Sequence, residues 1–396
     1  MLIPCHGIVC NIVNVCLIEA IRHSIYENGL DFIINFAMTA DTGTRRRADD
    51  QHFARKTIGG LTVIVPAYNE ADHIADTVRS LQNQSVHVEE IIVVDDCSTD
   101  GTGDAARACG VTVIRPSRNT GTKAGAQNFA LERVRTDFTM ALDADTTLAP
   151  NAIELLLKAF DQPEVAAACG FVVPRHVRSL WERGRYIEYL FAFTFYKPIQ
   201  DYYEKPLISS GCFSIYRTSI LEANKGWSSR TMAEDMDLTW SFYQSEHSVR
   251  FVPDAVCYPI EPHDFSFMRK QLKRWSHGFI QNVELHWKAV LEIRYLRTLV
   301  GLAMLDATVA SLAFLVLIPL LSIFVSPLFL LGYIIDAPAV LVPVLIKAYG
   351  RGEFWRALAS FPAFLVLRMV NAVFFLEAFW TELFLRQPLR VYEKGH

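Results

Sequence analysis

The stretch EEIIVVDDCSTDGT (residues 89–102) joins an apolar, β-branched run to a cluster of acidic and small polar residues. The run IIVV is typical of a buried strand. The residues that follow favour turns and helix starts, and Ser98 and Asp100 are suited to an Asx turn and a helix N-cap. The stretch therefore predicts a strand, a polar turn and the beginning of a helix.

The same pattern recurs on both sides of this stretch. LTVIV (61–65) precedes it and runs into PAYNE, VTVIR (111–115) follows it, and FTMAL (138–142) runs into DADT. Helical patterns near 71–84, 101–108 and 121–134 separate these strands. Strands alternating with amphipathic helices predict a parallel, doubly wound sheet, in which ligands bind beyond the carboxyl ends of the strands. We expect the polar groups after each strand to line one edge.

The distribution of apolar residues predicts membrane-spanning segments on the C-terminal side of this α/β region. The chain has 396 residues, 51% of them hydrophobic, and a net charge of -4, which argues against a disordered protein and against a nucleic-acid binder. The runs 309–325 and 326–346 are each about long enough to cross a hydrocarbon core of ~30 Å. Residues 361–384 form either a third span or a surface helix, because Arg368 and Glu377 are costly in lipid.

A weaker apolar stretch lies at the N-terminus. Residues 7–37 carry several charges and lack the pattern of a cleavable signal. Their hydropathy fits a membrane span and a segment outside the membrane equally well. If they insert, the basic run 45–47 keeps the following domain in the cytoplasm by the positive-inside rule. The eight cysteines include no C-x-x-C pair, so we expect reduced thiols and no zinc site.

Acidic residues follow two of the predicted strands. In LDADT, Asp143 and Asp145 can offer hard oxygen ligands to Mg²⁺ or Mn²⁺, which would neutralise phosphates, although most D-x-D triplets are solvated turns. On the neighbouring strand end, a carboxylate of Asp95 or Asp96 can hydrogen-bond a base or a ribose. Together these acids are stronger evidence for a ligand-binding site than any one of them, because the sheet would bring them to one edge.

Two further motifs carry side chains that could bind a ligand or take part in catalysis. Lys123, within NTGTKAGAQN, is suited either to phosphate or to helix capping, and the chain has no P-loop, which disfavours a P-loop NTPase. MAEDMDL (232–238) places three acids at a helix start, where they complement the helix dipole. An aspartate there could instead act as a general base if it reached an acceptor hydroxyl.

The motif QLKRWSHGF (271–279) stands just before the apolar C-terminal part. Arg274 can bind a diphosphate through two hydrogen bonds, and Trp275 can stack on the apolar face of a sugar ring. The alternative is an interfacial helix whose cations, Lys270 and Lys273 among them, meet lipid headgroups.

Taken in order, VIVPAYNE, VVDDCSTDGT, LDADT, AEDMDL and QLKRW resemble the motifs of membrane-bound inverting family 2 glycosyltransferases, such as bacterial poly-N-acetylglucosamine, chito-oligosaccharide and hyaluronan synthases. The resemblance covers roughly residues 58–295. It implies a glycosyltransferase A-type α/β fold with a mixed, mainly parallel sheet, plus interfacial and transmembrane helices. The implied parts are a membrane segment and basic linker (1–57), a catalytic domain (58–262), interfacial helices (263–297) and transmembrane helices with a short tail (298–396).

The resemblance also implies roles for individual residues. Asp235 would be the base that deprotonates the acceptor hydroxyl, with Glu234 beside it, and the α linkage of the donor would become β. Ala233 stands where the family has threonine. The UDP-sugar donor would contact Pro66, Tyr68, Glu70, Asp95, Asp96, Lys123 and Asp143; Asp143 and Asp145 would hold Mg²⁺ or Mn²⁺; and Gly211, Cys212, Gln271, Arg274 and Trp275 would contact the acceptor and the diphosphate.

Three functions remain open at this point. The leading hypothesis is a processive β-glycosyltransferase, multi-pass in the plasma membrane, that adds N-acetylglucosamine or another hexose to a glycan on the cytoplasmic side, with a homo-oligomer or an accessory export subunit as possible partners. The first alternative is a non-processive transferase with a lipid acceptor such as diacylglycerol or a polyprenyl phosphate. The second is a catalytically silent scaffold, against which Asp143, Asp145 and Asp235 argue together.

Overall fold

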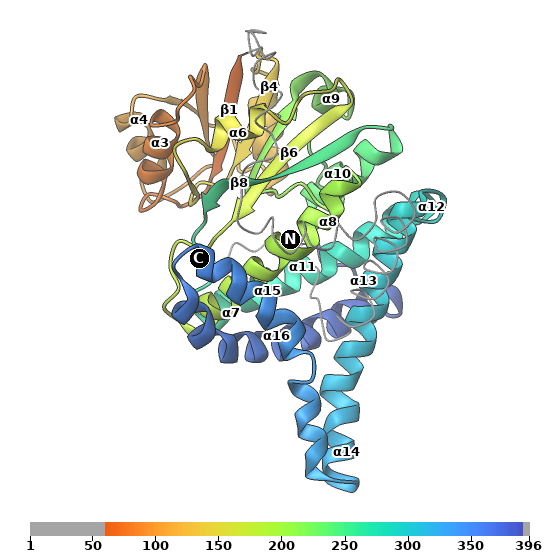
Figure 1. Ribbon diagram of the computed structural model, residues 1–396. Coiled ribbons are helices and arrows are strands. Elements are labelled where there is room, and N and C mark those ends of the chain that lie inside the picture. Colours follow the sequence, from red (N-terminus) through yellow and green to blue (C-terminus); the bar gives the residue numbers. More distant parts are fainter. Residues whose placement is uncertain (1–59, 391–396) are drawn as a thin grey trace, which may run out of the picture.

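The computed structural model describes residues 60–390, so the predicted N-terminal membrane segment lies outside the described residues. One sheet of eight strands forms the centre of the molecule, in the order β3-β2-β1-β4-β7-β6-β8-β5. Helices cover both of its faces, and a group of long helices lies beneath one edge (Figure 1).

The first half of the sheet follows the predicted alternation of strands and helices. Strands β1 to β4 pair in parallel, and β1 lies between β2 and β4. Alternate β1 residues face opposite sides of the sheet: Val63 and Val65 join one core cluster and Ile64 joins the other, which explains the continuous apolar run. The elements are β1 (Leu61–Ala67), α3 (Ile74–Gln82), β2 (Glu90–Asp95), α4 (Thr102–Ala108), β3 (Thr112–Ile114), α5 (Lys123–Leu131) and β4 (Phe138–Leu142).

The second half departs from a purely parallel, doubly wound sheet. Strand β7 (Phe213–Arg217) pairs antiparallel with β4 and with β6 (Val165–Val172), so the sheet is mixed. Because Leu142 at the end of β4 pairs with Phe213 at the start of β7, the residues just before β7 lie beside those just after β4. The remaining elements are β5 (Thr147–Leu148), α6 (Ala152–Leu157), α9 (Thr218–Ala223), α10 (Glu234–Gln244) and β8 (Ser248–Tyr258).

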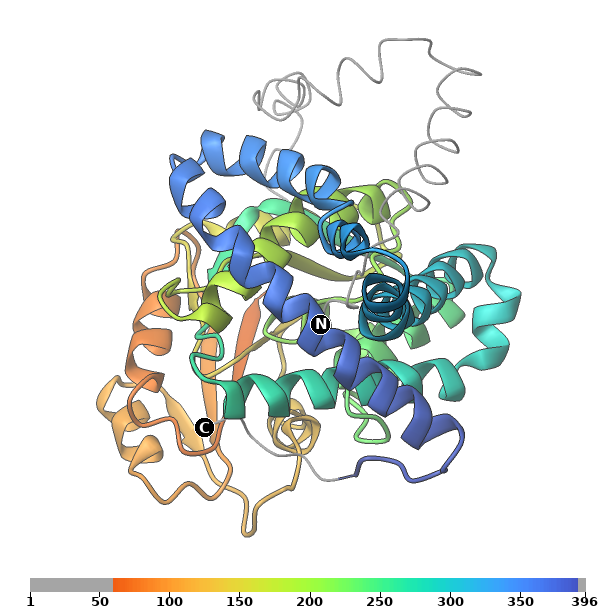
Figure 2. The same ribbon diagram turned by 90° about the horizontal axis from the view of Figure 1, so that it is seen from below.

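Three long helices lie against one another beneath the sheet. They are α7 (Leu180–Phe191), α11 (Phe265–Leu285) and α16 (Phe354–Leu383), and the view from below shows α16 crossing the other two (Figure 2). Gly184 of α7 permits this close packing, because a Cβ there would lie 3.0 Å from the carbonyl oxygen of Ala363. Shorter elements continue these helices: η1 (Ala192–Tyr196), α8 (Lys197–Tyr202) and α12 (Trp287–Glu292).

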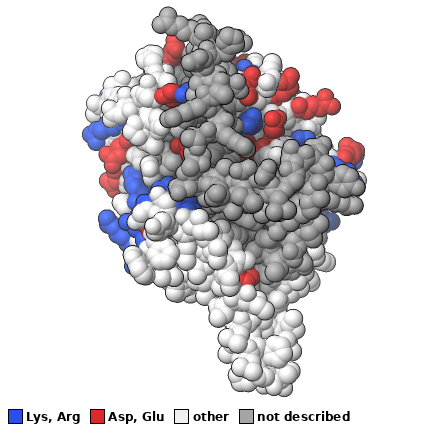
Figure 3. Space-filling view, in the orientation of Figure 1, with Lys and Arg blue, Asp and Glu red and all other residues white. Residues whose placement is uncertain are grey.

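Three apolar segments within residues 60–390 are long enough to cross a membrane: Arg294–Phe324, Pro327–Gly350 and Phe354–Leu383. The end of the first segment and the start of the second, residues 313–333, form a hairpin that projects away from the domain and shows almost no charged atoms, whereas the rest of the second segment packs against α7 and α16 (Figures 1 and 3). The third, α16, runs across the underside of the domain and differs in burial: 56% of its most apolar stretch is buried, against 28% and 17% for the other two. The component elements are α13 (Arg294–Leu312), η2 (Ala313–Leu317), α14 (Ile318–Phe324), η3 (Pro327–Tyr333) and α15 (Ala337–Gly350).

The charged residues that made 361–384 an uncertain span have partners. Arg368 donates two hydrogen bonds, of 2.9 and 2.7 Å, to the carboxylate of Asp336 at the start of α15. Glu377 lies 2.6 Å from the ammonium of Lys273 on α11. Pairing offsets much of the cost of holding a charge in apolar surroundings.

Candidate active site

A cavity of about 420 Å³ opens at the edge of the sheet where β1 and β4 end, and it collects nearly all of the predicted site residues. It lies between this edge and helices α10 and α11. The predicted residues that line it are Pro66, Tyr68, Glu70, Asp96, Lys123, Asp143, Asp145, Gly211, Cys212, Glu234, Asp235, Gln271, Arg274 and Trp275.

Asp95 does not line this cavity. Its side chain is almost completely buried, accepts a 2.9 Å hydrogen bond from the Ser98 amide and pairs with Arg115 at 2.5 Å. It therefore shapes the turn after β2 from behind.

The turns after β1 and β2 are held together by local hydrogen bonds. The amide of Asn69 donates to Ser98 Oγ at 3.0 Å, and the amide of Ala71 donates to Asp100 Oδ2 at 3.0 Å. Asp100 also accepts from the Thr102 amide at the start of α4. Asp100 thus forms the expected Asx turn, but the N-cap of α4 is Gly101, which has no side chain to cap it, and Ser98 instead holds the turn after β1.

Asp96 fixes the loop that leads to α5. Its two carboxylate oxygens accept 2.8 Å hydrogen bonds from the amide and the hydroxyl of Thr120, and its carbonyl accepts one of 2.7 Å from Asn119. Because α5 begins at Lys123, these contacts set where that lysine enters the cavity.

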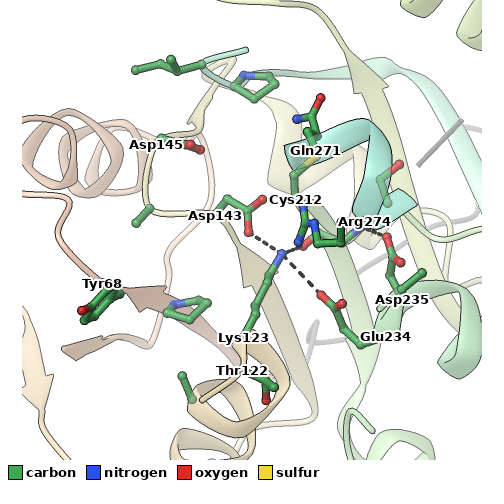
Figure 4. A pocket seen from close by; sticks show the side chains of 18 of the residues that line it. Tyr68, Thr122, Lys123, Asp143, Asp145, Cys212, Glu234, Asp235, Gln271 and Arg274 are labelled. Atoms are coloured by element: carbon green, nitrogen blue, oxygen red, sulfur yellow. Dashed lines mark hydrogen bonds and ion pairs between the residues drawn. The ribbon is translucent and has the colours of Figure 1, made fainter. Parts of the chain in front are cut away.

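Lys123 joins three parts of the site. Its ammonium donates to the carbonyl of Gly211 at 2.8 Å, forms an ion pair with Asp143, and lies 3.9 Å from Glu234 (Figure 4). Burial raises the pKa of Glu234, and the positive charge of Lys123 partly offsets that effect. The lysine thus balances acids from β4 and α10.

The D-x-D segment is held by its backbone. The amide of Asp143 donates to the carbonyl of Cys212 at 3.3 Å, and the partly buried Arg175 donates to the carbonyl of Asp145 at 2.7 Å. Within residues 60–390, no group of three or more His, Cys, Asp or Glu side chains is arranged to hold a metal ion. Two carboxylates still fit Mg²⁺ or Mn²⁺, since such ions commonly take one or two carboxylates and complete their shell with phosphates and water.

Asp235 and Asp237 differ sharply although both stand in the first turn of α10. Asp235 faces the cavity and accepts 2.9 Å hydrogen bonds from the amides of Gly211 and Met236. A Cβ at position 211 would lie 2.9 Å from Asp235 Oδ2, so a larger residue there would displace the Asp235 carboxylate.

Asp237 has a structural role instead. It accepts hydrogen bonds of 2.8 and 2.7 Å from Arg230, and its Oδ1 lies 2.7 Å from His286 Nε2. Burial favours a higher pKa for Asp237, but the hydrogen bonds from Arg230 and His286 outweigh it and lower the pKa. The two aspartates cannot be distinguished by their positions in MAEDMDL alone.

Helix α11 brings the QLKRW motif to the other end of the cavity. Asp264 caps this helix by accepting a 2.9 Å hydrogen bond from the Phe267 amide. Gln271, Arg274 and Trp275 reach the cavity, whereas Lys273 points to Glu377 of α16.

Sequence reasoning missed the groups that surround Gln271 and Trp275. Tyr189 and Glu261 also line the cavity, and the Tyr189 hydroxyl donates to Glu261 at 2.8 Å. Burial raises the pKa of Glu261, while Arg185 opposes that effect. The sequence signal for this cluster was the recurrence of charged residues within WERGRYIEY of α7. Such a pattern does not show whether these residues face solvent or a buried site.

The sequence is similar to that of known glycosyltransferases. Residues 62–224 match the family described as glycosyl transferase family 2. The poly-beta-1,6-N-acetyl-D-glucosamine synthase of Staphylococcus epidermidis is 25% identical over 226 residues, which are 56% of this chain and 55% of that protein. The synthase of the same name from Staphylococcus aureus strain MSSA476 is 26% identical over 224 residues, 55% of this chain and 54% of that protein. The chain therefore spans about half the length of the curated relatives it matches.

Among solved structures, a mannosyltransferase from Pyrobaculum calidifontis, determined in complex with GDP-Man and Mn²⁺, is similar with a TM-score of 0.53. The identity is 20%, and the match covers 80% of this chain and 87% of that one. The fold of the described residues is thus of the glycosyltransferase A type.

Proposed function

We propose that this chain, which carries a family 2 glycosyltransferase domain, transfers a sugar from a UDP-sugar to the end of a growing glycan at the cytoplasmic face of the membrane. One observation carries the proposal: Asp235, the D-x-D acids and the QLKRW residues line a single cavity although they are far apart in the sequence. N-acetylglucosamine is the sugar we favour, because the relatives that match are poly-beta-1,6-N-acetyl-D-glucosamine synthases.

The donor would occupy the end of the cavity formed by the strand ends. Pro66, Tyr68 and Asp96 would hold the uridine, and Asp95 would support the turn from behind. The diphosphate would lie near Lys123 and Arg274, whose positive charges suit it. Asp143 and Asp145 would hold Mg²⁺ or Mn²⁺, and that ion would offset the charge of the leaving diphosphate.

Asp235 is the group we assign as the general base. Its hydrogen bonds from the amides of Gly211 and Met236 orient the carboxylate toward the cavity. The acceptor hydroxyl would give its proton to Asp235 as its oxygen bonds to the anomeric carbon and the bond to the diphosphate breaks. Attack from the side opposite the leaving group inverts the linkage from α to β. Glu234 would help by holding Lys123 in place.

The acceptor would enter at the α11 end. Trp275 offers a flat apolar surface to a terminal sugar ring, and Gly211 and Cys212 lie between this surface and the β4 end. Since α11 packs on α16, this end of the cavity lies beside one of the three segments of residues 60–390 that are apolar and long enough to cross a membrane. Such a location suits a glycan leaving toward the bilayer, and it equally suits an acceptor linked to a lipid.

The test is to incubate membranes containing the protein with Mn²⁺ or Mg²⁺ and a panel of radiolabelled UDP-sugars. Release of UDP with a ladder of water-soluble, β-linked products is the expected result. Label confined to the organic phase as one or two sugars would replace the polymerase by a lipid glycosyltransferase with the same donor site. No UDP release, with Asp235→Asn indistinguishable from wild type, would favour the silent scaffold.

A further inference from the structure

Arg185 of α7 is completely buried and lies directly behind the acceptor end of the cavity. Its Nη2 donates a 2.7 Å hydrogen bond to Gln271 Oε1, and its guanidinium carbon lies 4.5 Å from the centre of the Trp275 ring. Both of these partners line the cavity, but Arg185 itself does not. A single side chain thus contacts the two residues on which acceptor binding would depend.

The shape of the guanidinium explains how one group can make both contacts. Its flat face covers the indole ring while an N–H at its edge points in the plane toward the amide oxygen of Gln271. A lysine ammonium is compact and has no such plane. Replacing the arginine by lysine keeps the charge and removes this pairing of stacking with a directed hydrogen bond.

The buried charge is balanced by two carboxylates. Glu188 forms an ion pair with Arg185 Nη1, and Glu261 Oε2 lies 3.5 Å from its Nε. A buried charge held between opposite charges has a fixed position, because any displacement leaves a carboxylate without its partner. Arg185 is therefore held firmly enough to fix its neighbours.

The same cluster reaches the apolar helix α16. Glu188 Oε1 accepts a 3.2 Å hydrogen bond from Asn371 of α16. Together with the close approach at Gly184, this contact seats α7 on α16. A continuous path of contacts thus leads from α16 through Glu188 and Arg185 to Gln271 and Trp275.

We propose that Arg185 is a positioning residue for the acceptor: it holds the Gln271 amide and the Trp275 indole in the orientation that receives the acceptor, and it has no part in donor binding. This inference rests on the proposed function of the cavity. It deepens that proposal by dividing the positively charged residues around the cavity into those for the diphosphate, Lys123 and Arg274, and one for the acceptor.

The test uses the full chain with Arg185→Lys, and Arg368→Lys as the matched control. Arg368 is also buried, paired with an aspartate and stacked on an aromatic ring, with 4.6 Å from its guanidinium carbon to the Phe314 ring, but it does not line the cavity. Three quantities are measured: UDP binding, the KM for the UDP-sugar, and the binding of a β-linked N-acetylglucosamine pentamer without donor.

We expect Arg185→Lys to weaken pentamer binding about tenfold or more, while UDP binding and the donor KM change less than twofold. Arg368→Lys should leave all three within twofold. Unchanged pentamer binding, or an equal loss of donor and pentamer binding in a folded variant, would overturn the inference. If Arg185→Lys does not accumulate in membranes, Glu188→Gln removes the charge that anchors Arg185 and should weaken pentamer binding in the same selective way.

Failure of the proposed function gives a different result. A wild-type protein that turns over no UDP-sugar contradicts the proposed function whatever Arg185 does. A wild-type protein that turns over donor and binds the pentamer, with Arg185→Lys unaffected, contradicts only the role of Arg185.

Discussion

The two ends of the cavity are built in different ways. The end proposed for the donor comes from turns that directly follow β1, β2 and β4, and hydrogen bonds between neighbouring turns hold it, such as those from residues 69–71 to Ser98 and Asp100. The acceptor end comes from α11, and its residues rest on Arg185 of α7, which in turn rests on α16. One end belongs to the sheet, and the other belongs to helices α11 and α7, which pack on the apolar helix α16.

This difference predicts that the two ends respond to different changes. Donor binding should depend on the strand-end turns and be insensitive to the packing of α16. Acceptor binding should depend on the contact between α16 and α7 that supports Arg185. Four substitutions test the division, in order of decreasing expected effect.

Asp235→Asn should have the largest effect, because it removes the proposed base from the junction between the two ends. We expect kcat to fall by about 10²- to 10⁴-fold, since that is the usual contribution of a positioned base. UDP binding should remain within a few-fold of wild type, because the amide keeps the shape of the side chain. Rates of UDP release and UDP titrations check both points. A variant with normal kcat would remove Asp235 from the mechanism.

Asp145→Asn should affect only the donor end. Loss of one hard oxygen ligand should raise the concentration of Mn²⁺ needed for half-maximal rate and lower kcat/KM for the UDP-sugar by about 10²-fold. The effect is measured from the rate of UDP release at increasing Mn²⁺ concentrations. Removing the metal from the wild type with a chelator provides the comparison. Pentamer binding should not change; if it does, the two ends are not independent.

Trp275→Leu should affect only the acceptor end. Removing the flat aromatic surface should weaken pentamer binding about tenfold, with donor KM nearly constant. Lys273→Ala is the control on the same helix, because its side chain points to Glu377 and not into the cavity. An equal effect of both substitutions would indicate a general disturbance of α11 and not a stacking surface.

Asp237→Asn should have the smallest effect on turnover and a clear effect on stability. It weakens buried hydrogen bonds to Arg230 and His286, so we expect the free energy of unfolding to fall by ~1–3 kcal/mol and kcat by less than tenfold. Thermal unfolding in detergent measures the first quantity. A kcat as low as that of Asp235→Asn would reverse the roles assigned to the two aspartates.

The stability effect of Asp237 should also depend on pH in a defined direction. The pKa of Asp237 is lowered in the folded protein. Its contribution to the free energy of unfolding is therefore complete at pH values above the pKa of about 3.9 for an unfolded aspartate, and it is lost as the pH falls below that pKa. The difference in Tm between wild type and Asp237→Asn should therefore be constant near neutral pH and shrink only in strong acid. A difference that shrinks between pH 7 and 5 would contradict this assignment.

The first half of the fold, and the gathering of the residues that follow its strands, could be predicted from the sequence. The strands predicted at LTVIV, EEIIVVD and FTMAL correspond to β1, β2 and β4, with β2 beginning one residue later than EEIIVVD, and the residues after them gather at one edge. The strand and helix pattern alone suggested a purely parallel sheet, which is wrong for the second half because β7 runs antiparallel to β4, whereas the mixed, mainly parallel sheet implied by the resemblance is confirmed. That reversal places Gly211 and Cys212 beside Asp143, which a parallel strand would not do.

By itself, the sequence determined the features that depend on chain connectivity. A strand and the turn after it are neighbours along the chain, and parallel register then brings successive turns together without further information. Only the tertiary structure decided the acceptor end, where Arg185 meets Gln271 across 86 residues and Glu188 meets Asn371 across 183. These contacts depend on how three helices pack, and a helical pattern shows which face is buried without showing which distant side chain will meet it.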